Sequence, residues 1–225
     1  MKYTNIEDFI IENGTLIDYI GYDTDIVIPN CVTNIAEYAF CEFEELTSVV
    51  IPNSVTSIGE NVFANCKNLT SVIIPNSVTS IDKFAFESCR SLTSVKIPDS
   101  VTSIDSDAFF DCTALKNIIV DENNKNYCSV NGVLFNKDKT ELIKCPEDND
   151  IAIFKIPDTV TIIRREAISC CSALQSVVIP DSVTNIGDMA FSCCKALTSV
   201  TIPNKVTRIS RGAFSGCTAL GRINT

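Results

Sequence analysis

The chain has 225 residues and a formal net charge of −10 at pH 7, with 45% apolar residues, 20% charged residues and no histidine. This composition provides a hydrophobic core and excludes a disordered chain; no apolar run approaches the roughly 18 residues of a membrane-spanning helix. The acidity argues against a nucleic-acid partner, and without histidine Ser-His-Asp catalysis, Cys-His catalysis and His-ligated metals are excluded.

The first 28 residues do not follow the pattern of the remainder. Glu7, Asp8 and Glu12 interrupt any apolar export region, so no signal peptide is expected and the sequence by itself predicts a cytoplasmic protein. Residues 9–19 predict two strands around Asn13-Gly14, a pair typical of a type I′ hairpin turn. We interpret residues 1–28 as an N-terminal β-hairpin cap.

A 23-residue period organises residues 29–225. It is marked by Pro29, Pro52, Pro75 and Pro98, and then by Pro157, Pro180 and Pro203. The interval from Pro98 to Pro157 is 59 residues, which is one ordinary step and one step of 36. Asp121 stands where the missing proline is expected. The period therefore predicts eight coils, of which the fifth carries an insertion.

Each coil repeats the same residue types at fixed offsets from its proline. In the coil of Pro75 these are Val78 at offset 3, Ile81 at 6, Phe86 at 11, Leu92 at 17 and Val95 at 20. Alternating residues predict a strand before the proline and a shorter one after it. The segment between them has room for a single helical turn. A lone coil cannot offset the entropy of ordering its backbone, so the coils must stack on a shared core.

Residues 69–89 have the pattern Leu-x-x-Val-x-Ile-Pro-x-x-Val-x-x-Ile-x-x-x-Ala-Phe-x-x-Cys. This resembles the BspA-like class of bacterial leucine-rich repeats, and the resemblance extends over about residues 26–225. It implies a repeat solenoid, a right-handed stack of coils with a parallel concave β-sheet, short second strands and single helical turns. A parallel β-helix is the alternative fold. The resemblance also implies adhesion or partner binding and a cell-surface or secreted location.

The insertion is expected at about residues 127–147. Asn131-Gly132 repeats the turn signature of the cap, and we expect a β-hairpin that replaces the helical turn of the fifth coil. Two interpretations of the insertion stay open: it is a protruding element that binds a partner, or it is a variant coil that binds none. At the other end, the sequence stops within the eighth coil, which predicts apolar edges and an end-to-end dimer through that coil, or a longer chain.

Twelve cysteines are present, and six of them share offset 14: Cys66, Cys89, Cys112, Cys171, Cys194 and Cys217. Cysteine is small and readily buried, so these six are expected to point inward as free thiols. Cys170 and Cys193 precede two of them, which raises a Cys₄ zinc site as an alternative. Because consecutive residues point apart and no CxxC spacing occurs, we expect no metal and no cofactor.

The sequence favours a non-catalytic binding module that presents a solenoid surface to a protein partner or in adhesion. A structural spacer, or a fragment of a larger surface adhesin, is the alternative, and catalysis is not expected. The candidate partner-binding residues are those at offsets 19 and 21 of the concave sheet: Ser48, Val50, Ser71, Ile73, Ser94, Lys96, Asn117, Ile119, Ser176, Val178, Ser199 and Thr201.

Overall fold

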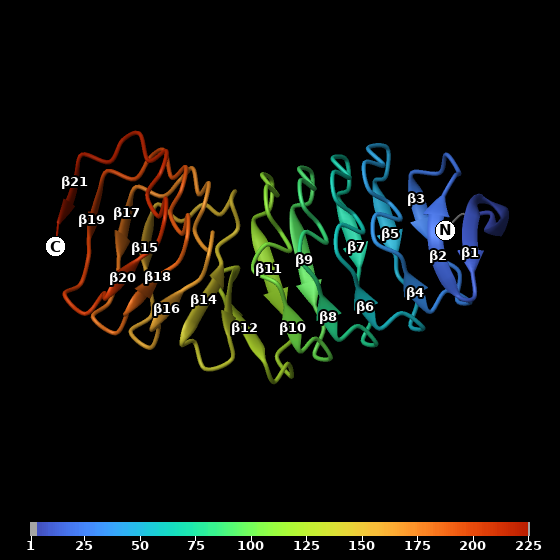
Figure 1. Ribbon diagram of the computed structural model, residues 1–225, viewed down its shortest axis with the longest axis horizontal. Coiled ribbons are helices and arrows are strands. Elements are labelled where there is room, and N and C mark those ends of the chain that lie inside the picture. Colours follow the sequence, from blue (N-terminus) through green and yellow to red (C-terminus); the bar gives the residue numbers. More distant parts are fainter. Residues whose placement is uncertain (1–3, 225) are drawn as a thin grey trace. The chain divides into compact units, whose positions relative to one another are not determined.

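The computed structural model describes residues 4–224, with side chains described as far as Gly221. These residues form two compact units. The first comprises the described residues up to Leu115 together with Ile119–Asn126, and the second comprises Lys116–Ile118 and the chain from Tyr127 onward. Within each unit, successive coils contribute strands to parallel sheets (Figure 1). The predicted repeat solenoid is confirmed.

In the first unit, a 3-10 helix, η1 (Ile6–Asp8), precedes the antiparallel pair β1 (Phe9–Glu12) and β2 (Thr15–Tyr19). The strands that precede a proline, or Asp121 in the case of β11, are called here the long strands. They are β3 (Asp25–Val27), β5 (Ser48–Val50), β7 (Ser71–Ile73), β9 (Ser94–Ile97) and β11 (Asn117–Val120), the last shared between the units. The short strands are β4 (Asn34–Ile35), β6 (Ser57–Ile58), β8 (Ser80–Ile81) and β10 (Ser103–Ile104).

The second unit contains two sheets, one made of long strands and one that starts with the inserted hairpin. Its long strands are β15 (Ile153–Lys155), β17 (Ser176–Val178), β19 (Ser199–Thr201) and β21 (Arg222–Asn224), in that order. Its other sheet begins with β12 (Tyr127–Val130), β13 (Val133–Asn136) and β14 (Glu141–Lys144) and continues with the short strands β16 (Ile162–Ile163), β18 (Asn185–Ile186) and β20 (Arg208–Ile209).

The strand register reproduces the sequence period. Ser48 is aligned with Ser71 and Val49 with Val72 between β5 and β7, a step of 23 residues. Because side chains alternate along a strand, Val49 lies in the core while Ser48 and Val50 face outward. In the core of the first unit, the phenylalanines at offset 11 form a continuous stack of rings: Phe40, Phe63, Phe86 and Phe109.

The segment expected to form a helical turn is a series of reverse turns instead. Tyr38 and Glu42 have φ of 64° and 63°, a left-handed conformation that a right-handed helix cannot include. The N–H of Phe40 donates to the carbonyl of Val62 in the next coil at 3.0 Å, rather than back along its own segment. Bonds between coils therefore alternate with turn bonds inside the segment, such as that from the N–H of Cys41 to the carbonyl of Tyr38 at 2.8 Å. In the described part of the chain, η1 is the only helix, and it has neither the length nor the hydropathy of a membrane span.

The insertion occupies a different place from the expected one. Instead of replacing the helical turn, its last strand β14 pairs in parallel with β16, with Leu142 aligned to Ile163, so it stands where a short strand is expected. Leu142 and Phe135 are buried in the core of the second unit. The physical reason is that an unpaired edge of β16 and its apolar residues need a neighbour, and β14 supplies both ladder and packing.

We expect Gly132→Ala to destabilise the protein by about 1–3 kcal/mol. Gly132 has φ of 79°, and an added Cβ would lie 3.0 Å from the carbonyl oxygen of Lys116 and 2.6 Å from Oδ1 of Asn117. Gly14 has φ of 78° in the N-terminal hairpin, but its added Cβ would press mainly on the side chain of Thr33. Gly14→Ala is therefore the matched control, and chemical denaturation of equal effect in both variants would contradict the backbone clash.

Candidate functional site

The outward face of the long strands carries the candidate partner-binding residues. In the first unit, five of these side chains are exposed and two are half-buried. The exposed ones are Ser71, Ile73, Ser94, Lys96 and Ile119, and the half-buried ones are Ser48 and Val50. Asn117, at the start of β11 in the second unit, is also exposed. In the other long strands of the second unit, Val178, Ser199 and Thr201 are exposed and Ser176 is half-buried. The structure thus gathers these residues on sheet faces, separately in each unit.

These faces combine small polar and apolar side chains. In the first unit, Ile73 and Ile119 are 51% and 50% exposed at offset 21. The Nζ of Lys96 lies 4.0 Å from Oδ2 of Asp121, an ion pair between an exposed lysine and a half-buried aspartate. Such a surface offers hydroxyl groups and apolar side chains, which suits contact with a macromolecule more than enclosure of a small molecule.

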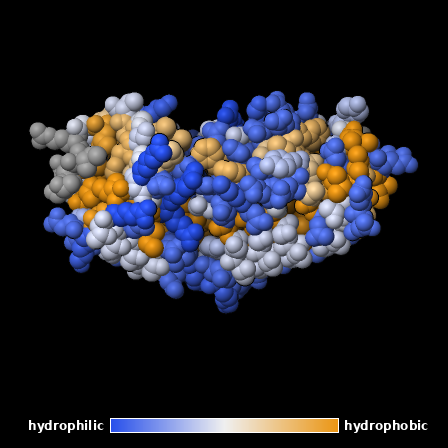
Figure 2. Space-filling model, in the orientation of Figure 1, coloured by the Kyte–Doolittle hydropathy of each residue, from blue (hydrophilic) through white to orange (hydrophobic). Residues whose placement is uncertain are grey.

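Further apolar side chains gather over β1 and β2 in the first unit and over β19 and β20 in the second (Figure 2). Ile10 and Ile17 of the hairpin are each about two-fifths exposed. Ile209 of β20 is 48% exposed, whereas Ile186, one coil earlier at the same offset, is fully buried. The coil of residues 206–220 therefore exposes side chains that the preceding coils bury.

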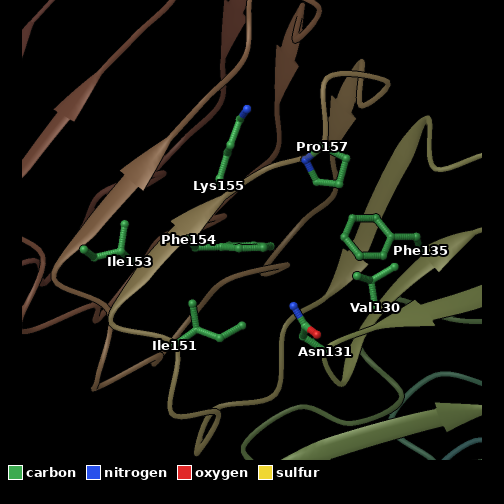
Figure 3. Close-up of a pocket in the computed structure, with 8 residues that line it drawn as sticks. All are labelled: Val130, Asn131, Phe135, Ile151, Ile153, Phe154, Lys155 and Pro157. Atoms are coloured by element: carbon green, nitrogen blue, oxygen red, sulfur yellow. The ribbon is translucent and has the colours of Figure 1, made fainter.

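A groove of about 280 Å³ lies within the second unit, between the hairpin β12–β13 and strand β15. The hairpin side is lined by Val130, Asn131 and Phe135. The strand side is lined by residues that surround β15: Ile151, Ile153, Phe154, Lys155 and Pro157. Figure 3 shows the ring of Phe154 pointing toward Val130 and Phe135, which form the floor of the groove with it. The side chains of Ile153 and Lys155 point away from these three residues.

None of the groove residues is among the twelve candidate partner-binding residues of the long strands, although Val130, Asn131 and Phe135 belong to the insertion for which a binding role stayed open. The sequence contains one signal for them, because Ile153 stands at offset 19, where the neighbouring strands β17 and β19 have Ser176 and Ser199. An isoleucine 71% exposed at a serine position marks an apolar surface. The sequence predicts a hairpin that contains Val130 and Asn131, but it gives no sign that this hairpin lies beside β15, which is about 20 residues further along the chain.

The thiols at offset 14 have a structural role that periodicity did not show. Cys66, Cys89, Cys112, Cys171 and Cys194 are buried and Cys217 is half-buried, all as free cysteines. The Sγ of Cys66 donates to the carbonyl of Phe40 at 3.0 Å, and the Sγ of Cys89 donates to that of Phe63 at 3.2 Å. These carbonyls also accept a backbone N–H, that of Phe43 at Phe40 and that of Cys66 at Phe63, so the thiol is a second, weak donor that links one coil to the preceding one.

We expect alkaline pH to destabilise the fold through these thiols. Burial raises the pKa of Cys66 to about 12 and holds the pKa of Cys89 and Cys194 well above the ordinary value of 9.0. The unfolded chain releases these protons near pH 9 while the folded chain keeps them, so the free energy of unfolding falls as pH rises above about 9. Denaturation midpoints between pH 7 and 10.5 measure the fall.

Cys89→Ala is the test variant for that pH dependence, and it should flatten the alkaline slope. Cys31 is exposed and supplies the control, because Cys31→Ala removes a thiol that solvent already reaches. An unchanged slope in Cys89→Ala, or rapid alkylation of Cys89 in the folded protein, would contradict burial as the cause.

Charged and thiol groups also lie together inside the second unit. Nζ of Lys144 is 3.7 Å from Oε1 of Glu147, and both side chains are almost fully buried. Burial, followed by the Glu147 carboxylate, raises the pKa of Cys170 to about 12. No group of three or more cysteine or carboxylate side chains in the described residues has the arrangement of a metal site. The zinc alternative therefore has no support from this geometry.

Comparison with known proteins places these features in a family. The family model described as BspA type leucine rich repeat region, in six copies, matches residues 18–139 and 144–225. A search of curated proteins found no match.

Several solved structures have the same architecture. A leucine-rich repeat protein from Eubacterium ventriosum is 29% identical with a TM-score of 0.80, and the match covers 93% of this chain. The chain spans 65% of that protein's length. A leucine rich cell surface protein from Faecalibacterium prausnitzii is 24% identical with a TM-score of 0.66, covering 99% and 88% of the two chains. The pneumococcal vaccine antigen PcpA is 21% identical with a TM-score of 0.70, covering 93% and 71%.

Proposed function

This chain belongs to the BspA-type leucine-rich repeat family, and from that premise we propose that it is a non-catalytic module that binds a protein partner through the outward face of its long strands. The observation that carries the proposal is the set of exposed columns at offsets 19 and 21. They hold small hydroxyl and apolar side chains at a spacing fixed by the strand register. An extended surface of this kind is what a solenoid offers a macromolecular partner.

The chemistry of this face favours a protein over other partners. The net charge of −10 disfavours nucleic acid. Ile73 and Ile119 supply exposed apolar area that a protein partner can bury and a polyanion cannot. Catalysis is not part of the proposal, because the candidate residues include no general base or nucleophile with an activating partner.

A cell-surface or secreted location and an adhesive role are proposed on the family resemblance, and fractionation of the producing cells tests the location. A structural spacer is the alternative function. Its distinguishing property is that substitutions on the outward face leave all interactions of the protein unchanged.

The double variant Lys96→Glu with Ile119→Asp is expected to abolish partner capture. It places two carboxylates beside Asp121 and removes the most exposed apolar contact of β11. The charge-matched control is Lys125→Glu with Ser103→Asp, at exposed positions outside the long strands. Affinity capture from surface extracts, compared by quantitative mass spectrometry, measures the loss. Equal capture by the wild type and both double variants favours the spacer.

An end-to-end dimer through residues 206–220 is a second proposal, supported by the exposure of Ile209. Sedimentation velocity of wild type and Ile209→Lys tests it. A dimer that dissociates in the variant supports the contact, and a monomeric wild type at micromolar concentration excludes it.

A further inference from the structure

The tip of the inserted hairpin occupies a position that a long strand would otherwise take. The N–H of Ile118 in β11 donates to the carbonyl of Gly132 at 3.0 Å. The Nδ2 of Asn149 donates to the carbonyls of Lys116 and Asn131, at 3.2 and 3.0 Å. The tip is thereby fixed beside the start of β11. Within the described residues, β15 pairs only with β17, so it is an edge strand of its sheet.

The backbone groups available at this edge follow from the bonds to β17. The carbonyl of Ala152 accepts from the N–H of Ser176, and the N–H of Ile156 donates to the carbonyl of Val178. Alternate residues of a strand direct their N–H and C=O groups to opposite sides. The groups of Ile153 and Lys155 therefore point away from β17, toward the groove. An edge of this kind is a template for one more strand.

The groove beside the edge has the size and chemistry of a side-chain pocket. Its volume of about 280 Å³ is near the lower limit for small-molecule sites, so it suits one or two apolar side chains of a peptide. Val130 is 37% exposed on its hairpin side and the ring of Phe154 forms part of its floor. Lys155 is exposed at the rim, and no ion pair to it is found in the described residues.

We propose that β15 takes up an extended peptide segment of a partner protein as an added strand. An apolar side chain of that segment enters the groove, and a carboxylate near it pairs with Lys155. This mode uses main-chain hydrogen bonds for affinity and a pocket at alternate residues for specificity. The inference rests on the proposed binding function only in naming the kind of partner, because the groove is separate from the residues tested on the outward face.

The free protein provides the first test. The amides of Ile153 and Lys155 are expected to exchange with deuterium at rates near those of an open chain, while the amide of Phe154 is protected by its bond to β17. Amide-resolved exchange of the full chain measures this. Strong protection of Ile153 and Lys155 without added peptide would overturn the proposal, because the edge would already be occupied.

Displayed random dodecapeptides are the probe for binding. Selection on the full chain should enrich extended sequences with an apolar residue close to an aspartate or glutamate. Val130→Asp should weaken the selected peptides at least about tenfold, a change of about 1.4 kcal/mol. Ile10→Asp, in strand β1 of the N-terminal hairpin, is the matched control, because Ile10 is 39% exposed and lies outside the groove, and it should leave their affinity unchanged. Lys155→Glu should shift selection toward lysine or arginine in place of the acid.

Methylation of the peptide backbone separates strand addition from simple apolar contact. N-methyl groups at alternate residues of a selected peptide should abolish binding in one register and be tolerated in the other. Failure to enrich any peptide, or binding that is insensitive to Val130→Asp, would overturn the proposal. Either result leaves the proposed function intact if Lys96→Glu with Ile119→Asp still abolishes capture. If peptides bind in the groove while Lys96→Glu with Ile119→Asp captures partners normally, the proposed binding by the outward face is wrong and the proposed binding in the groove stands.

Discussion

Replacing Glu147 by alanine is expected to lower the free energy of unfolding by about 3–5 kcal/mol. The Nζ of Lys144 lies 3.7 Å from Oε1 of Glu147, and the two side chains are 2% and 3% exposed. Truncation leaves the ammonium group in the interior without this carboxylate, and burial of an uncompensated charge is costly. Chemical denaturation of the purified variant, followed by circular dichroism, measures the loss.

Two controls show that burial causes this loss. Glu44→Ala breaks the ion pair with Lys67, whose partners are 53% and 43% exposed, and is expected to cost about 0–1 kcal/mol. Lys144→Met combined with Glu147→Met removes both buried charges, and it should recover most of the stability because no charge is left without a partner. A double variant as unstable as Glu147→Ala would contradict the electrostatic explanation.

The thiol of Cys170 reports on the charge of Glu147 by a second measurement. Because the Glu147 carboxylate helps to raise the pKa of Cys170, Glu147→Gln should lower that pKa. The variant should therefore alkylate faster at Cys170 than the wild type at pH 9. Mass spectrometry after brief iodoacetamide treatment of the folded protein resolves Cys170 from the neighbouring exposed Cys193.

The strand register could be predicted from the sequence, whereas the turns could not. A 23-residue spacing of Val49, Val72 and Val95 requires their strands to align if all three face one core, and β5 and β7 pair in that register. The positive φ of Asn61 agrees with the tolerance of asparagine for the left-handed region, but Phe84 and Met189 adopt it without any such preference. Closure of the coil against its neighbours, a tertiary effect, imposes that conformation.

The groove was beyond sequence reasoning for a related reason. Its lining includes Val130 and Phe154, which are distant in sequence and belong to different sheets. The hairpin turn at Asn131-Gly132 could be predicted from local chemistry. The attachment of this turn to the start of β11 could not be predicted. It depends on the side-chain amide of Asn149, which donates to two carbonyls and is not part of the 23-residue repeat.

Phe86→Ala is expected to destabilise the first unit by about 3–5 kcal/mol. Phe86 is fully buried and stacks on Phe63 at 5.4 Å and on Phe109 at 5.5 Å, with interplanar angles of 11° and 4°. Alanine would remove the transfer energy of the ring, leave a cavity and break both stacked contacts. Phe86→Ile should cost less, because Ile168 fills the same offset in the second unit and is also fully buried.

A double-mutant cycle distinguishes stacking from simple volume. Phe63 and Phe86 are in contact, so the losses in Phe63→Ala and Phe86→Ala should be coupled by about 0.5–3 kcal/mol. Phe40 contacts Phe63 and is one coil further away, so Phe40→Ala and Phe86→Ala should be additive within about 0.5 kcal/mol. In a stacked array each coil contacts only its neighbours, and the coupling should therefore end after one step. Coupling of equal size between Phe40 and Phe86 would show that the core of the first unit responds as a whole.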